Sequence, residues 1–143
     1  MNELTYTIYD MSVGTRISCT AHTKDVKEAC KCALSIHKEN DVTSWVISEW
    51  FTDEKLKHQG IGKKTMYELL KYCKYISGIP DTIEYVWNGE NEYVMDWLSS
   101  NFDAVCLCPI AVQKTQADDD WSSHQYMLNK VKVLNYFGIE VNS

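Results

Sequence analysis

A short glycine-containing segment in the middle of the chain carries the residues best suited to bind a phosphate group. It runs from position 57 to position 64 and reads Lys-His-Gln-Gly-Ile-Gly-Lys-Lys. Glycine allows a tight backbone turn and a close approach to a ligand. The first N–H groups of a helix lack partners within the helix, and its dipole places partial positive charge there. Because Lys57, Lys63 and Lys64 add charge at the same point, the segment predicts an anion site at a helix N-terminus.

Two common phosphate-binding motifs do not describe this segment. A P-loop ends in Gly-Lys-Ser/Thr, whereas Gly62 and Lys63 are followed by Lys64, which has no hydroxyl group. A dinucleotide-binding fingerprint requires a third glycine where this chain has Thr65. The segment therefore predicts another kind of phosphate ligand.

No metal site is predicted from the cysteine, histidine and aspartate pattern. Cys30 and Cys32 fall in a predicted helix and would point to nearly opposite sides, and the four histidines lack zinc-ligand spacing. Cys106 and Cys108 would share one face of a strand, but two further ligands are missing. The aspartates at 118–120 match no calcium loop and are expected at a charged hairpin tip. Without an export signal, all six cysteines are expected as reduced thiols.

The composition limits the class of protein. The chain has 143 residues, of which 45% are hydrophobic and 24% charged, typical of a single folded domain over 1–143. Its formal net charge of −6 argues against general nucleic-acid binding, which needs a basic face. No apolar stretch is long enough to span a membrane, and the first residues do not resemble a secretion signal. We therefore expect a cytoplasmic protein, or one of the host cytoplasm if it is viral.

Hydrophobic periodicity predicts a mixed sheet with helices packed on it. Strands are predicted over 4–9, 15–20, 43–51, 82–87, 102–112 and 124–129, with the first two forming a hairpin. Helices are predicted over 23–38, 61–75, 91–100 and 131–137. The helix over 23–38 rests on apolar residues at helical spacing from Val26 to His37, with Thr23 as its N-cap.

The glycine segment and its surroundings resemble the GCN5-related N-acetyltransferase (GNAT) superfamily. The family signature, Gln/Arg-x-x-Gly-x-Gly/Ala, opens the helix behind the central strand, and residues 57–62 match it with lysine in first place. A strand at 85–87, Asn91, Trp97-Leu98 and Asn101-Phe102 follow the family's next stretch. The resemblance covers about 43–127 and implies an α/β (α+β) fold. Its sheet would be mixed and mostly antiparallel, with helices on both faces, whereas the part before position 43 is shorter than usual.

The resemblance also implies a co-substrate, acetyl-CoA, and no metal. In the family, the pyrophosphate lies on the glycine-loop amides, and the pantetheine arm pairs with the central strand where a bulge opens the sheet. On this chain the corresponding binding positions are Trp50, Phe51, Thr52, Lys57, His58, Gln59, Gly60, Ile61, Gly62, Lys63 and Asn91.

Acyl transfer to an amine also requires a base and an acid. Glu49 on the central strand is the candidate base. The tyrosine that serves as the acid in the family corresponds to Leu98, and Tyr93, one turn earlier, is the nearest substitute.

Two functions follow from the resemblance. The first is an N-acetyltransferase that acts on a primary amine, either a small molecule or a protein, and works as a monomer or homodimer. The acidic composition favours a cationic acceptor. The alternative is a catalytically inactive GNAT-like binding protein or a phage virion-associated structural protein, suggested by Leu98 and the shortened first half.

Overall fold

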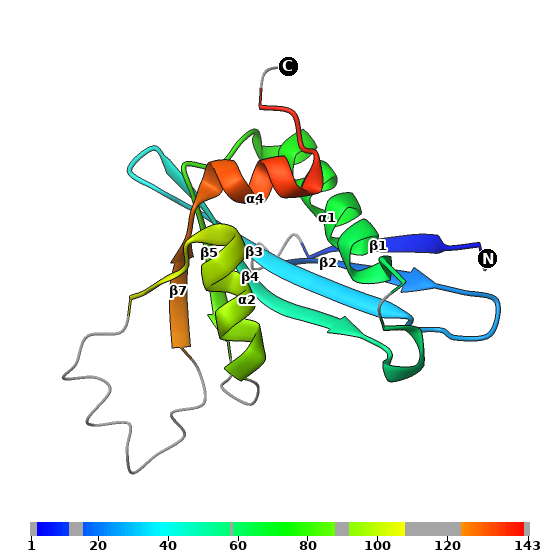
Figure 1. Ribbon diagram of the computed structural model, residues 1–143. Helices are drawn as coiled ribbons and strands as arrows, with labels where there is room; N and C mark the ends of the chain where they lie inside the picture. The colour runs from blue at the N-terminus through cyan, green and yellow to red at the C-terminus, as the bar shows by residue number, and fades with distance from the viewer. Residues whose placement is uncertain (1–2, 12–15, 58, 88–91, 108–123, 142–143) are drawn as a thin grey trace, which may run out of the picture.

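The computed structural model describes residues 3–11, 16–57, 59–87, 92–107 and 124–141, with the side chains of 87, 92–95 and 124 excepted. Within these residues, seven strands form one sheet in the order β1-β2-β3-β4-β5-β7-β6 (Figure 1). Only β4 and β5 pair in parallel, and every other described pair is antiparallel. The strands are β1 (Thr5–Met11), β2 (Arg16–His22), β3 (Cys30–Glu39), β4 (Val42–Thr52), β5 (Thr82–Trp87), β6 (Val105–Cys106) and β7 (His124–Leu128). The predicted α+β fold with a mixed, mostly antiparallel sheet is therefore confirmed.

Three helices and one short turn of 3-10 helix complete the described fold. The helices are α1 (Ile61–Ser77), α2 (Glu92–Phe102) and α4 (Lys130–Phe137), and the 3-10 turn is η1 (Glu54–Leu56). They agree with the predicted helices over 61–75, 91–100 and 131–137 to within a few residues. Gly78 ends α1 with a φ of 78°, which lets its N–H reach the oxygen of Lys74 at 2.8 Å.

The predicted helix over 23–38 is wrong. Cys30, Cys32, Leu34 and Ile36 are buried at every second position, which is the period of a strand, and β3 pairs with both β2 and β4. Asn40 and Asp41 both have positive φ angles, 53° and 66°, and make the tight turn between β3 and β4. Thr23 does accept a hydrogen bond from the Val26 N–H at 3.0 Å, but in a turn rather than at a helix start.

The predicted strand over 102–112 is mostly not observed within the described residues. Phe102 ends α2, where its buried ring lies 5.2 Å from that of Trp97, and only Val105 and Cys106 form a strand. Positions 108–112 lie outside the described residues, as do the aspartates at 118–120. The strands predicted at 4–9, 15–20, 43–51, 82–87 and 124–129 are confirmed as β1, β2, β4, β5 and β7.

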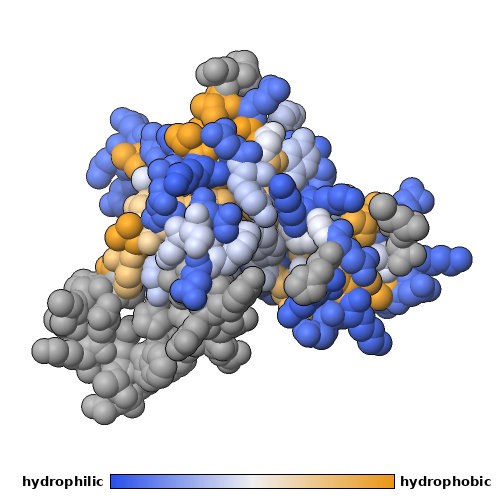
Figure 2. Space-filling view, viewed as in Figure 1, coloured by the Kyte–Doolittle hydropathy of each residue, from blue (hydrophilic) through white to orange (hydrophobic). Residues whose placement is uncertain are grey.

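The core lies between the sheet and α1. Ile17 and Cys19 of β2 and Cys32 of β3 are buried together with Leu69 and Cys73 of α1. Hydrophilic residues cover much of the face seen in Figure 1, with smaller hydrophobic areas between them (Figure 2). Among the described helices, none is both long and apolar enough to cross a membrane.

Candidate active site

A β-bulge interrupts the central strand β4 at Ser48. Ile47 lies opposite Leu34 of β3 and Glu49 lies opposite Ala33, so Ser48 is an extra residue in β4. The pairing of β4 with β5 ends at Ile47 and Tyr85. Beyond that point, from residue 48 to residue 52, the edge of β4 that faces β5 has no β5 residue in register. Such an edge offers N–H and C=O groups to an extended ligand.

The glycine loop places N–H groups that have no acceptor among the described residues beside this open edge. Gly60 precedes α1 with a φ of 79°, a conformation that glycine adopts without strain. Its oxygen accepts the N–H of Lys64 at 3.1 Å. The described residues provide no acceptor for the N–H groups of Ile61, Gly62 and Lys63. These three donors, at the positive end of the α1 dipole, form the geometry that favours an anion.

One cavity of about 730 Å³ joins the open edge of β4 to the glycine loop. Residues predicted as binding positions that line it are Trp50, Phe51, Thr52, Lys57, Gly60, Ile61 and Gly62. Residues that the sequence did not single out for binding also line it, namely Asp53, Glu54, Leu56, Tyr85, Trp97 and Leu98. The central strand, the loop that follows it, β5 and α2 therefore enclose the same space.

The remaining predicted binding residues lie differently. The Lys63 Nζ atom lies 4.3 Å from the centre of the Tyr136 ring, a cation–π contact with α4. Gln59 is exposed and does not line the cavity. His58 and Asn91 lie outside the described residues. Lys57 does line the cavity, and its Nζ is 2.9 Å from the Glu54 carboxylate. The lysine charges near the loop are thus partly engaged by other residues.

Trp50 connects the bulged strand to the glycine loop. Its indole nitrogen donates a hydrogen bond to the Gly62 oxygen at 3.2 Å. Its ring lies 5.5 Å from Trp97 of α2 and 5.7 Å from Phe137 of α4, centre to centre. Contacts of this kind hold the cavity wall against both helices.

Solved structures show which fold this geometry belongs to. A protein from Klebsiella pneumoniae described as an acyl-CoA N-acyltransferase has 11% identity over 88% of this chain and 97% of its own, with a TM-score of 0.60. A GNAT-family acetyltransferase from Staphylococcus aureus has 15% identity, covering 85% of this chain and 72% of its own, with a TM-score of 0.59. Arabidopsis thaliana Naa50, solved with a bisubstrate analogue containing CoA, has 13% identity over 78% of this chain and 70% of its own, with a TM-score of 0.54. The chain has the GNAT fold. No protein-family model and no curated sequence matches it.

Within the GNAT fold, the candidate base Glu49 lies just after the bulge. It stands opposite Ala33, on the face of the sheet that is turned away from α1. Its Oε2 atom accepts a hydrogen bond from the Arg16 guanidinium at 2.8 Å, and both side chains are partly exposed. The ion pair holds a carboxylate at the point where β4 and β5 separate. Arg16 was not predicted as a site residue, because only the register of β2, β3 and β4 brings it to Glu49.

Leu98, the residue predicted at the family's acid position, cannot donate a proton. Leu98 is 1% exposed and lines the cavity. Tyr93 lies in α2, but its side chain is not among those described. Tyr85 of β5 does line the cavity, and burial raises its pKa to about 12, so that its phenol keeps its proton. The sequence pattern predicts Tyr85 only as a strand residue, because its place at the last β4–β5 pair depends on register.

A group of thiols lies behind the cavity wall. Cys30 and Cys32 are strand residues, so their side chains share one face and their Sγ atoms lie 4.0 Å apart, contrary to the prediction that they point opposite ways. The pKa of Cys30 falls to about 7. The largest cause is its hydrogen bond with Cys32, which lowers the pKa by more than burial raises it. Thr52, which lines the cavity, donates to the Cys30 Sγ at 3.7 Å. No cluster of metal-ligating side chains is found in the described part of the chain.

Proposed function

We propose that the protein transfers an acetyl group from acetyl-CoA to a primary amine. The observation that carries this proposal is the meeting of two features in one cavity. Trp50 to Thr52, from the part of β4 that has no β5 residue in register, line it, and so do Ile61 and Gly62, whose N–H groups have no acceptor among the described residues. A diphosphate requires the second feature and an extended amide-containing arm requires the first.

The residues present suit acetyl-CoA as the acyl donor. Gly60, Ile61 and Gly62 would hold the diphosphate through main-chain N–H groups, and Trp50, Phe51 and Thr52 would hold the pantetheine arm. Glycine at position 62 keeps this approach open, because a Cβ there would lie 3.1 Å from the Thr52 hydroxyl. The co-substrate supplies an activated acetyl thioester.

The reaction needs one proton acceptor and one proton donor. Glu49 takes the proton from the acceptor ammonium, which leaves a neutral amine able to attack the thioester carbonyl. The new C–N bond forms, the C–S bond breaks, and the nitrogen gives its second proton to water, so that the product is a neutral amide. The phenol of Tyr85, which lines the cavity, then gives its proton to the departing thiolate. Tyr93 remains the second candidate for this proton.

Titration calorimetry with acetyl-CoA, followed by a thiol-release assay with amines, tests the proposal. We expect micromolar binding, and release of CoA that depends on the amine. Binding without thiol release for any amine would support the inactive GNAT-like alternative. Absence of any acetyl-CoA binding would overturn the proposal and leave a binding or virion-associated structural protein.

A further inference from the structure

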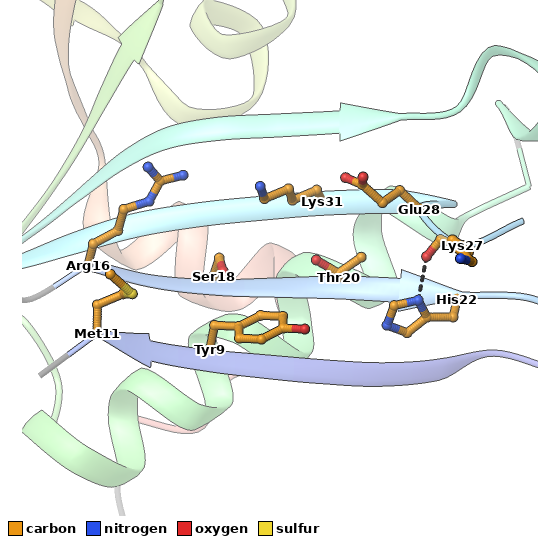
Figure 3. Close-up of a pocket in the computed structure, with 9 residues that line it drawn as sticks. All are labelled: Tyr9, Met11, Arg16, Ser18, Thr20, His22, Lys27, Glu28 and Lys31. Carbon is orange, nitrogen blue, oxygen red and sulfur yellow. Dashed lines mark hydrogen bonds between the residues drawn. The ribbon is translucent and has the colours of Figure 1, made fainter.

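A groove of about 550 Å³, lined mainly by residues with polar or charged groups, lies on the sheet face that is turned away from α1 (Figure 3). Side chains alternate along β2, so Ile17 and Cys19 are buried in the core, whereas Ser18 and Thr20 line the groove. Tyr9 of β1 borders it and is 57% exposed. Figure 3 shows no helix over these side chains. The groove is therefore a separate space from the cavity beside the glycine loop.

The groove reaches the candidate base. Ala33 lies opposite Glu49, and Lys31, on the same side of β3, lies opposite Phe51. Arg16 lines the groove and also donates to the Glu49 carboxylate. Same-face neighbours on a strand are about 7 Å apart, so Lys31 lies about that distance along β3 from the position beside Glu49. An acceptor amine at Glu49 would thus extend towards Lys31.

The charge of the groove is opposite to that of the whole chain. Arg16, Lys27 and Lys31 line it, against one lining carboxylate, Glu28, while the chain has a net charge of −6. In the described part of the protein, Lys27 and Lys31 have no ion-pair partner. His22 is occupied by hydrogen bonds to the Thr7 hydroxyl and the Lys27 oxygen. Two lysines that have no ion-pair partner among the described residues therefore remain to meet an anion.

We propose that the groove binds the carboxylate of the acceptor, so that the preferred acceptors are small amines that also carry a carboxylate. This inference rests on the proposed acetyl transfer. Lys31 pairs with the carboxylate, and the ion pair orients the amine towards Glu49. The local charge thus favours an acceptor that carries a carboxylate beside its amine, rather than the purely cationic one that the overall composition suggests.

Three amines of similar length separate the charge classes. Calorimetry measures the binding of γ-aminobutyrate, its neutral amide and putrescine to the protein saturated with CoA, which prevents turnover. We expect γ-aminobutyrate to bind most tightly and putrescine most weakly. Lys31→Gln should weaken binding of γ-aminobutyrate by about two- to fivefold and leave binding of the amide unchanged, the range for one partly exposed ion pair.

Lys38→Gln is the matched control. Lys38 is an exposed lysine of the same strand, in register with Thr43 and on the opposite face from Lys31. Equal effects of the two substitutions on γ-aminobutyrate, or tighter binding of putrescine, would overturn the inference while CoA binding still supports the proposed function. A protein that does not bind CoA would overturn both.

Discussion

The indole nitrogen of Trp50 donates a hydrogen bond to the carbonyl oxygen of Gly62 at 3.2 Å. This bond ties the part of β4 beyond the bulge to the first turn of α1. The strand edge and the helix N-terminus are the two features on which the proposed binding of acetyl-CoA depends. Their separation is therefore fixed by a side chain rather than by the loop between them.

Gly62→Ala tests how closely this arrangement must be kept. The added Cβ would lie 3.1 Å from the Thr52 hydroxyl and 3.3 Å from Trp50 Nε1, so both neighbours must move by a few tenths of an ångström. We expect the affinity for acetyl-CoA, measured by calorimetry, to fall about tenfold, and the free energy of unfolding to fall by about 1 kcal/mol. Unchanged affinity would show that the Trp50–Gly62 distance does not control binding.

Gly60 gives a contrasting prediction, because its constraint is conformational and not steric. Its φ is +79°, and a Cβ at this position would meet nothing within 4 Å. Gly60→Ala should therefore lower the free energy of unfolding by about 1 kcal/mol, as expected for a residue forced into the left-handed region. Gly60→Asn should cost less, since asparagine tolerates that region better. Urea unfolding of the two variants decides the point, and equal losses would contradict it.

Glu49→Gln should separate catalysis from binding. The amide keeps the shape of the side chain but cannot accept the ammonium proton, so kcat should fall by about 100-fold or more. The affinity for acetyl-CoA should stay the same, because Glu49 does not line the cavity. Glu39→Gln, at an exposed carboxylate at the end of β3, is the control. A kcat within twofold of the wild type would exclude Glu49 as the base.

Tyr85→Phe and Tyr93→Phe together identify the acid. If Tyr85 protonates the leaving thiolate, its loss lowers kcat by about 100-fold and leaves the acetyl-CoA affinity unchanged. Tyr93→Phe should then have little effect. The reverse result would assign the acid to Tyr93, and activity in the double variant would mean that neither phenol is required.

The sequence could predict the parts of the site that are local. The glycine loop and α1 follow from a turn residue and a helical period over consecutive positions, and both are present. The helix expected over 23–38 failed because the segment satisfies two periods at once. Its residues from Val26 to His37 fit a helix, while Cys30, Cys32 and Leu34 fit a strand. The segment from Cys30 to Glu39 becomes a strand because it pairs with β2 along one edge and with β4 along the other.

The residues missed by sequence reasoning are those placed by register. Arg16 reaches Glu49 across β3, and Tyr85 reaches the cavity because it forms the last pair between β4 and β5. Neither position carries a local pattern that marks it. One local signal was available, since Asn40-Asp41 is a residue pair that tolerates the positive φ angles of a tight hairpin turn. A hairpin turn at Asn40-Asp41 predicts a strand before position 40 as well as after it.

The buried thiols predict that the protein loses stability above about pH 9. Burial raises the pKa of Cys19 and that of Cys73 to about 12, from a value of 9.0. Between these values the unfolded chain has released both protons and the folded protein still holds them, so the free energy of unfolding falls as the pH rises. The slope is about 1.4 kcal/mol per pH unit for each thiol.

Cys73→Ala should remove one such contribution in urea unfolding under reducing conditions between pH 9 and 11. Cys106→Ala, at an exposed cysteine, should leave the slope unchanged, and an equal slope in all three proteins would contradict the assignment.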